Sequence, residues 1–138
     1  MTVGETLATA LPILRAQAES MMRDTVRIER DTGATTQDPV TLEEVPVWET
    51  VYEGPGRWQR PDTVAAEKVS GEVEFGLNRV TVQLPMSDPA TGNAARGQRA
   101  TCVTAAYDPA LVGAQATVLA VPNKTHATMR RLLCEEVT

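Results

Sequence analysis

Residues 47–60 read VWETVYEGPGRWQR, and the alternation of side chains in this stretch decides the fold class. Trp48 and Tyr52 fall on one face of an extended chain, whereas Val47 and Val51 fall on the opposite face. A period of two residues is typical of a β-strand that has one face packed on a core. The stretch therefore predicts a strand rather than a helix.

The Gly-Pro-Gly sequence at 54–56 predicts a turn that separates a strand over 47–53 from a short strand over 57–59. The polar residues 32–44 are also interpreted as turn material. The same alternation predicts five further strands, at 24–31, 80–84, 99–106, 116–121 and 129–137. Short strands separated by turn signals indicate a mainly β protein, a small antiparallel β-barrel or sandwich.

The N-terminal residues 1–23 predict a helix, and residues 24–138 the β-barrel domain. Thr2 and Glu5 have the spacing of a capping box. Pro12 predicts a kink, or a helix that begins near this residue. The helix either packs on its own domain or docks onto a partner through an apolar stripe. The candidate docking residues on this stripe are Leu7, Leu11, Leu14 and Met21.

Residues 61–78 form a long insertion between two predicted strands, longer than loops of compact domains usually are. The segment could be a long hairpin that projects from the barrel, or a loop that becomes ordered only on binding. It is acidic, with four carboxylates against one lysine. The candidate residues for an assembly or channel loop are Val64, Glu67, Lys68, Val69, Glu72, Val73, Glu74 and Phe75.

The composition excludes several classes of protein. The 138 residues suit one domain, and 42% hydrophobic residues suit a globular core. No apolar run reaches the roughly 18 residues that a membrane span needs, and charged residues interrupt any apolar core of a signal peptide. The formal net charge of −5 disfavours a protein that coats nucleic acid. We expect a soluble protein of the cytoplasm.

No pattern predicts catalysis, a cofactor or a bound metal. His126 is the only histidine and is expected on the surface, in a polar turn. Cys102 and Cys134 fall in predicted strands and are expected to be inert core residues. The chain contains no Gly-x-Ser-x-Gly elbow and no phosphate-binding Gly-rich loop. The sequence therefore predicts a protein that is not an enzyme.

The order of the elements resembles a known family. RDTVRIERDTG (23–33) is followed by VWETVYEGPGRWQRP (47–61), a long loop and NRVTVQLPM (78–86). The chain then continues through three further segments, which are RGQRATCVT (96–104), DPALVGAQATVLAV (108–121) and TMRRLLCEEV (128–137). In this arrangement the chain resembles the head-closure proteins of long-tailed bacteriophages and prophages, which are also called stopper or head–tail joining proteins.

The resemblance implies a structural connector of the virion neck that is assembled in the cytoplasm of the host bacterium. Copies would form a ring between the portal or its adaptor and the tail terminator or tail tube. The ring would close the DNA-filled head and dock the tail, while DNA passes through the channel without sequence-specific binding. The purified protein is expected to be monomeric or weakly associated. The alternatives are another neck protein, such as a tail terminator, or an oligonucleotide-binding barrel.

Overall fold

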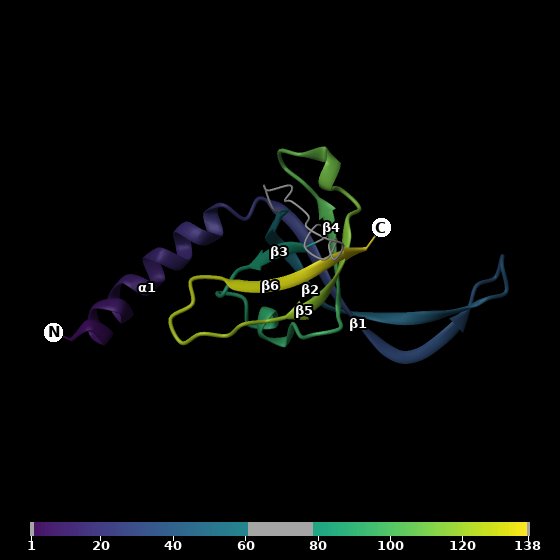
Figure 1. The fold of residues 1–138 in the computed structure, drawn as a ribbon, viewed down its shortest axis with the longest axis horizontal. Helices are drawn as coiled ribbons and strands as arrows, with labels where there is room; N and C mark the ends of the chain where they lie inside the picture. The colour runs from purple at the N-terminus through teal and green to yellow at the C-terminus, as the bar shows by residue number, and fades with distance from the viewer. Residues whose placement is uncertain (1, 61–78, 138) are drawn as a thin grey trace, which may run out of the picture.

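The computed structural model describes residues 2–60 and 79–137, which form one α-helix and a six-stranded antiparallel barrel (Figure 1). The strands close in the order β1-β2-β3-β6-β5-β4, and each pairs with its neighbours in antiparallel register. The predicted mainly β fold with an N-terminal helix is thus confirmed. The elements are α1 (Val3–Ser20), β1 (Asp24–Gln37), β2 (Glu44–Gln59), β3 (Arg79–Leu84), β4 (Arg99–Thr104), β5 (Gln115–Ala120) and β6 (Arg130–Val137), with 3₁₀ turns η2 (Pro89–Asn93) and η3 (Pro109–Leu111).

The prediction of a turn at 54–56 is wrong, because β2 continues through Gly54, Pro55 and Gly56. These residues form a corner of the barrel at which β2 changes partner. Up to Gly56 the strand pairs with β1, and from Arg57 onward it pairs with β3. Glycine at a tight bend of a barrel strand gives the same local sequence as a turn. The two strands predicted over 47–53 and 57–59 are therefore one strand.

Close packing at this corner requires a glycine at position 56. A Cβ atom on Gly56 would lie 2.8 Å from Val26 Cγ2 and 3.1 Å from the carbonyl oxygen of Gln83. The Tyr52 hydroxyl donates a hydrogen bond of 2.6 Å to the carbonyl oxygen of Pro55 and so braces the bend from inside β2. The bend lets the strand leave one neighbour and close the barrel with the next.

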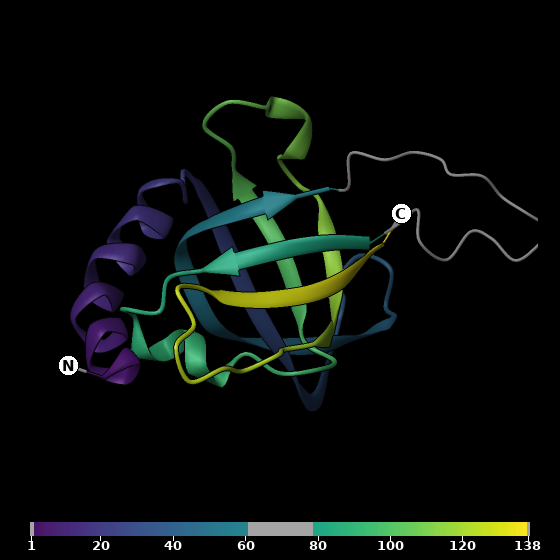
Figure 2. The same ribbon diagram turned by 60° about the vertical axis from the view of Figure 1, so that its left-hand side comes forward.

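Figure 2 shows the strands curving around the interior of the barrel, and alternate residues of these strands fill it. Each buried aliphatic side chain contributes roughly 1.5–3 kcal/mol relative to an exposed one. Cys102 and Cys134 are fully buried free thiols, as the sequence predicts. The largest fully buried apolar side chains are Val26, Ile28, Val82, Leu84, Val118 and Leu132.

The helix α1 begins at Val3 and contains Pro12, so the expectation of a start near the proline is wrong. The predicted capping box is present, because the Thr2 side chain accepts from the Glu5 amide and the Glu5 carboxylate accepts from the Thr2 amide. The cap starts the helix upstream, and the exposed position of Pro12 leaves the unpaired carbonyl of the preceding turn open to water. No helix of the described residues is long and apolar enough to cross a membrane.

Candidate assembly surfaces

The apolar stripe of α1 lies largely open. Leu7, Leu14 and Met21 are 37%, 41% and 52% exposed, and Leu11 is half-buried. Ala18 is the one side chain of the helix that is buried. The four candidate docking residues therefore lie where a partner could reach them, although their docking role stays a prediction.

Polar contacts fix α1 beside the barrel (Figure 2). Arg15 Nε donates a hydrogen bond of 2.9 Å to the carbonyl oxygen of Ala127, in the loop between β5 and β6. The Glu19 carboxylate accepts a 2.8 Å hydrogen bond from the Ser87 hydroxyl, after β3. These two bonds and the buried Ala18 hold the helix against the barrel, while Leu7, Leu14 and Met21 stay exposed.

The inserted segment 61–78 lies outside the described residues. The candidate channel residues between Val64 and Phe75 therefore stay a prediction from the sequence.

A projecting arm, which we define as residues 31–48, is the largest feature that the sequence did not reveal. The prediction of turn material over 32–44 holds only for residues 38–43, because β1 extends to Gln37 and β2 begins at Glu44. Beyond Glu29, β1 is no longer paired with β4, so the arm is a two-stranded ribbon. The arm and α1 lie at opposite ends of the long axis of the molecule (Figure 1).

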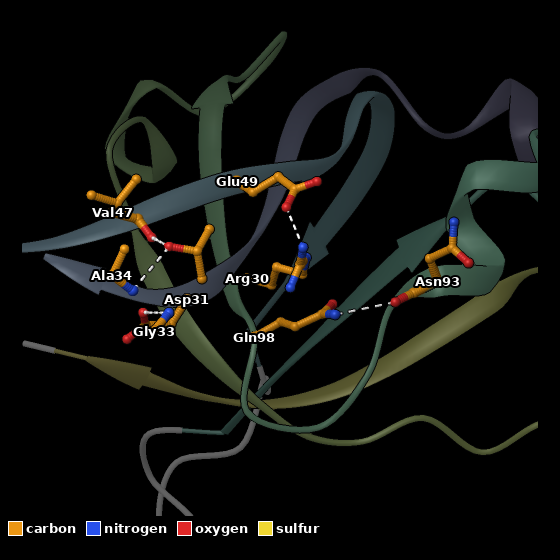
Figure 3. A network of polar contacts seen from close by, with 9 residues as sticks. Arg30, Asp31, Gly33, Ala34, Val47, Glu49, Asn93 and Gln98 are labelled. Atoms are coloured by element: carbon orange, nitrogen blue, oxygen red, sulfur yellow. Dashed lines mark hydrogen bonds and ion pairs between the residues drawn. The ribbon is translucent and has the colours of Figure 1, made fainter.

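Polar contacts hold the two strands of the arm together near its root (Figure 3). Arg30 and Glu49 form an ion pair across the strands. The Thr32 hydroxyl donates a hydrogen bond of 2.8 Å to the carbonyl oxygen of Val47 and accepts one of 3.2 Å from the Ala34 amide. The strands of the arm are thus joined by polar contacts between side chains and backbone, since the β1 residues of the arm are not buried against a core.

The guanidinium group of Arg99 anchors the root of the arm to the barrel. It lies 3.9 Å from the ring centroid of Trp48, a cation–π geometry. The same group donates a 2.9 Å hydrogen bond to Glu29 Oε1 on β1. One arginine from β4 therefore contacts both strands of the ribbon.

The tip of the arm is an ordered turn over residues 38–43. The Leu42 amide donates a 2.8 Å hydrogen bond to the carbonyl oxygen of Asp38, and the Asp38 amide donates one of 2.9 Å to that of Glu43. This turn holds Leu42 at a φ of 64°, a left-handed conformation that bulky residues rarely adopt. Val40 and Leu42 are 86% and 65% exposed, so the turn presents apolar side chains to solvent.

A third candidate surface, after the stripe of α1 and the arm, is an open groove of about 570 Å³. It lies between the end of α1, β2 and the loop after β4. Met21 and Tyr107 are exposed on it, Tyr107 to 78%. Arg23 and Arg57 supply positive charge and form no ion pair with the described carboxylates. The groove therefore combines apolar surface with two arginines that no described carboxylate pairs with.

The two cysteines and the histidine, which the sequence predicts to be without a catalytic role, lie as follows. Burial raises the pKa of the Cys102 thiol to about 11 and that of Cys134 to about 12, which keeps both thiols protonated at neutral pH. His126 is exposed, as predicted. Over residues 2–60 and 79–137, no three His, Cys, Asp or Glu side chains gather so that they could hold a metal ion.

Comparison with known proteins gives a family and one fold relative. A family described as "Family of unknown function (DUF6093)" matches residues 14–135. No curated protein matches the chain. The solution structure of protein SF1141 from Shigella flexneri 2a is similar, with a TM-score of 0.53 and 19% sequence identity. The alignment covers 83% of this chain and 92% of that protein, and at this identity it supports the fold alone.

Proposed function

We propose that this chain, which belongs to the DUF6093 family of unknown function, is a structural connector of the bacteriophage neck. In this proposal copies form a ring between the portal or adaptor and the tail. The ring closes the filled head and docks the tail terminator or tail tube. The order of sequence segments that resembles head-closure proteins is the origin of the proposal.

The projecting arm is the structural observation that best supports this function. A ribbon that leaves the barrel at its root and ends in exposed Val40 and Leu42 adds nothing to the core of its own chain. Isolated two-stranded hairpins are marginally stable in water, so such an arm is favoured when another surface covers it. The open stripe of α1 offers a second contact surface at the other end of the molecule.

An oligonucleotide-binding barrel draws less support from the aromatic residues. Binding to single strands uses exposed aromatic side chains on which bases stack. Trp58 and Tyr52 are buried in the core, and Arg99 covers the ring of Trp48. Tyr107 alone is exposed among the described aromatic residues. Retention on single-stranded DNA at low salt would favour this alternative.

The direct test is deletion of the gene from the phage or prophage that encodes it, followed by electron microscopy of the particles. A head-closure protein is needed after DNA packaging and before tail attachment. We expect separate heads and tails, with DNA lost from the heads, and restoration of tailed particles by the wild-type gene in trans. Normal tailed particles in the deletion strain would overturn the proposal.

A further inference from the structure

We propose that the tip of the arm of one copy binds the groove of a second copy, so that copies join head to tail. The contact gives the ring of the proposed function its subunit interface, and its biological meaning rests on that function. The groove is the surface defined by Met21, Arg23, Arg57 and Tyr107. Apolar match, charge match and the distance between the two surfaces each support the pairing.

The apolar match is the first argument. The tip carries Val40 and Leu42, and the groove carries Met21 and Tyr107, all of which are more than half exposed. Leu42 is held in a left-handed conformation by the hydrogen bonds of the turn. Backbone strain of this kind persists at sites of contact with ligands or partners. The turn therefore holds the Leu42 side chain in a fixed position, from which it can contact Met21 and Tyr107 of a second copy.

The charge match is the second argument. The arm over 31–48 carries four carboxylates and no basic residue. Glu43 and Glu44, beside the tip, form no ion pair with the described cations. Arg23 and Arg57 in the groove are likewise unpaired among the described residues. Opposite charges at the rim of an interface steer association and fix its register.

Two carboxylates, those of Asp24 and Asp108, lie close to the groove, and both accept hydrogen bonds from backbone amides rather than from the groove arginines. The Asp24 carboxylate accepts hydrogen bonds of 3.2 Å from the Trp58 amide and 3.3 Å from the Ala106 amide. The Asp108 carboxylate accepts one of 3.0 Å from the Ala110 amide. Among residues 2–60 and 79–137, no carboxylate forms an ion pair with Arg23 or Arg57 that an incoming carboxylate would have to displace.

The distance between the two surfaces excludes docking within one chain. The groove lies at the start of β1, beside Arg23, and the tip lies beyond its end at Gln37. A strand of 14 residues spans roughly 40 Å, so β1 itself separates the tip of the arm from the groove of the same chain. The occupant must be a second molecule.

Two different surfaces that bind each other produce a heterologous interface, and such interfaces close into rings when the rotation permits. The tip offers only a few side chains, so one contact falls below the roughly 1,200 Å² that stable interfaces bury. The isolated protein is then weakly associated, in agreement with the expectation from the sequence. Closure of the ring on a neighbouring assembly supplies the remaining stability.

Cysteine cross-linking of the purified full-length protein tests the contact. We expect a Leu42→Cys chain and a Tyr107→Cys chain, mixed at high concentration under mild oxidation, to form a mixed disulfide dimer at least tenfold above background. The background comes from Leu42→Cys mixed with Thr125→Cys, which is exposed on a different loop. The native thiols are buried and do not compete. Equal yields in the two mixtures would overturn the proposal.

Charge reversal tests the specificity in the same assay. The arm variant is the Leu42→Cys chain with Glu43→Arg and Glu44→Arg. The groove variant is the Tyr107→Cys chain with Arg23→Glu and Arg57→Glu. Each variant, mixed with the other cysteine chain that has its natural charges, is expected to lose the cross-link. A mixture of the arm variant with the groove variant is expected to regain it, because a reversed arm then meets a reversed groove. Circular dichroism checks that the variants are folded. Equal cross-link yields in all of these mixtures would contradict the proposal.

The assay uses purified protein, so its failure is distinct from failure of the proposed function. A specific cross-link together with normal tailed particles in the gene deletion would retain the interface and reject the neck role. Untailed particles in the deletion together with background cross-linking would retain the neck role and reject this interface.

Discussion

At the scale of single residues, three buried hydroxyl and thiol groups tie the stability of the barrel to pH. Burial raises the pKa of Cys102 to about 11 and that of Cys134 to about 12. Burial also raises the pKa of Tyr52 to about 12, and Asp88 and Glu19 add to this effect. The hydroxyl of Tyr52 is the donor that braces the corner of β2, a role that requires its proton.

The first prediction is loss of stability at alkaline pH. In the unfolded chain cysteine and tyrosine lose their protons near pH 8.5 and 10, respectively. Because the folded pKa values are higher, the protonated groups favour the folded state. This stability is complete below about pH 8.5 and is lost as pH rises towards about 12. Urea unfolding midpoints should fall steadily over that range.

A thiol assay provides the control for this prediction. The two cysteines should react with Ellman's reagent slowly in the folded protein at neutral pH and at once in denaturant. Rapid reaction of either thiol without denaturant would show that the barrel interior is open, and it would contradict the assignment of both residues to the core.

At the scale of elements, the corner of β2 provides the second prediction. Gly56→Ala places a methyl group 2.8 Å from Val26 Cγ2 and 3.1 Å from a backbone oxygen, which has little freedom to move. We expect a loss of about 1–3 kcal/mol in the free energy of unfolding, since overpacking of a core costs this amount. Chemical denaturation measures the loss.

Gly92→Ala is the matched control. A Cβ atom there meets only Arg130 Nη2, at 3.6 Å, which is an ordinary contact with the end of a flexible side chain. Its stability should differ little from that of the wild type. Equal stability of the two alanine variants would show that the corner does not need a glycine.

The elements that the sequence predicted best are those with one buried face. In β3, Val80 and Val82 alternate with Thr81, and the strand begins and ends within one residue of the expected range. Burial produces the period of two from which such strands are recognised. The helix was recognised by its capping box, although the exposed Pro12 suggested a later start.

The arm and the corner were missed for physical reasons. Residues 32–37 belong to β1, and 35–37 pair with β2, but none of them is buried, so their sequence lacks apolar alternation. At 54–56 the Gly-Pro-Gly sequence is compatible with both a turn and a bend inside a strand, and only the change of partner from β1 to β3 distinguishes them. The groove joins Met21, Arg57 and Tyr107 from distant parts of the chain, so no local pattern contains it.

At the scale of the whole molecule, the two elements that lie outside the barrel occupy opposite ends. The acidic arm projects at one end of the long axis, and α1 occupies the other. The described residues close the barrel by themselves, since all six neighbouring pairs of strands are bonded within them. The candidate assembly surfaces are therefore additions to a barrel that closes without them.

This completeness leads to the last prediction, which concerns the inserted segment 61–78. Gln59 pairs with Thr81, so the strands on either side of the segment lie next to each other. Deletion of residues 64–74 shortens the connection from 18 to seven residues. The loop-closure entropy then changes by less than about 1 kcal/mol. We expect a thermal unfolding midpoint close to that of the wild type.

In the phage, the same deletion should abolish tail attachment or DNA retention, because the proposed neck function assigns the contacts of this acidic segment to assembly. Complementation of the gene deletion, scored by plaques and by electron microscopy, measures this effect. A variant in which a Gly/Ser linker of equal length replaces residues 64–74 separates loss of the side chains from loss of length, and it should fail as well. Unfolding of the shortened protein would show that the segment is part of the barrel. Normal plaques from the shortened variant would show that the segment has no role in assembly, and the neck function would then depend on the arm and on α1 alone. Normal plaques from the linker variant only would show that the length of the segment matters and its side chains do not.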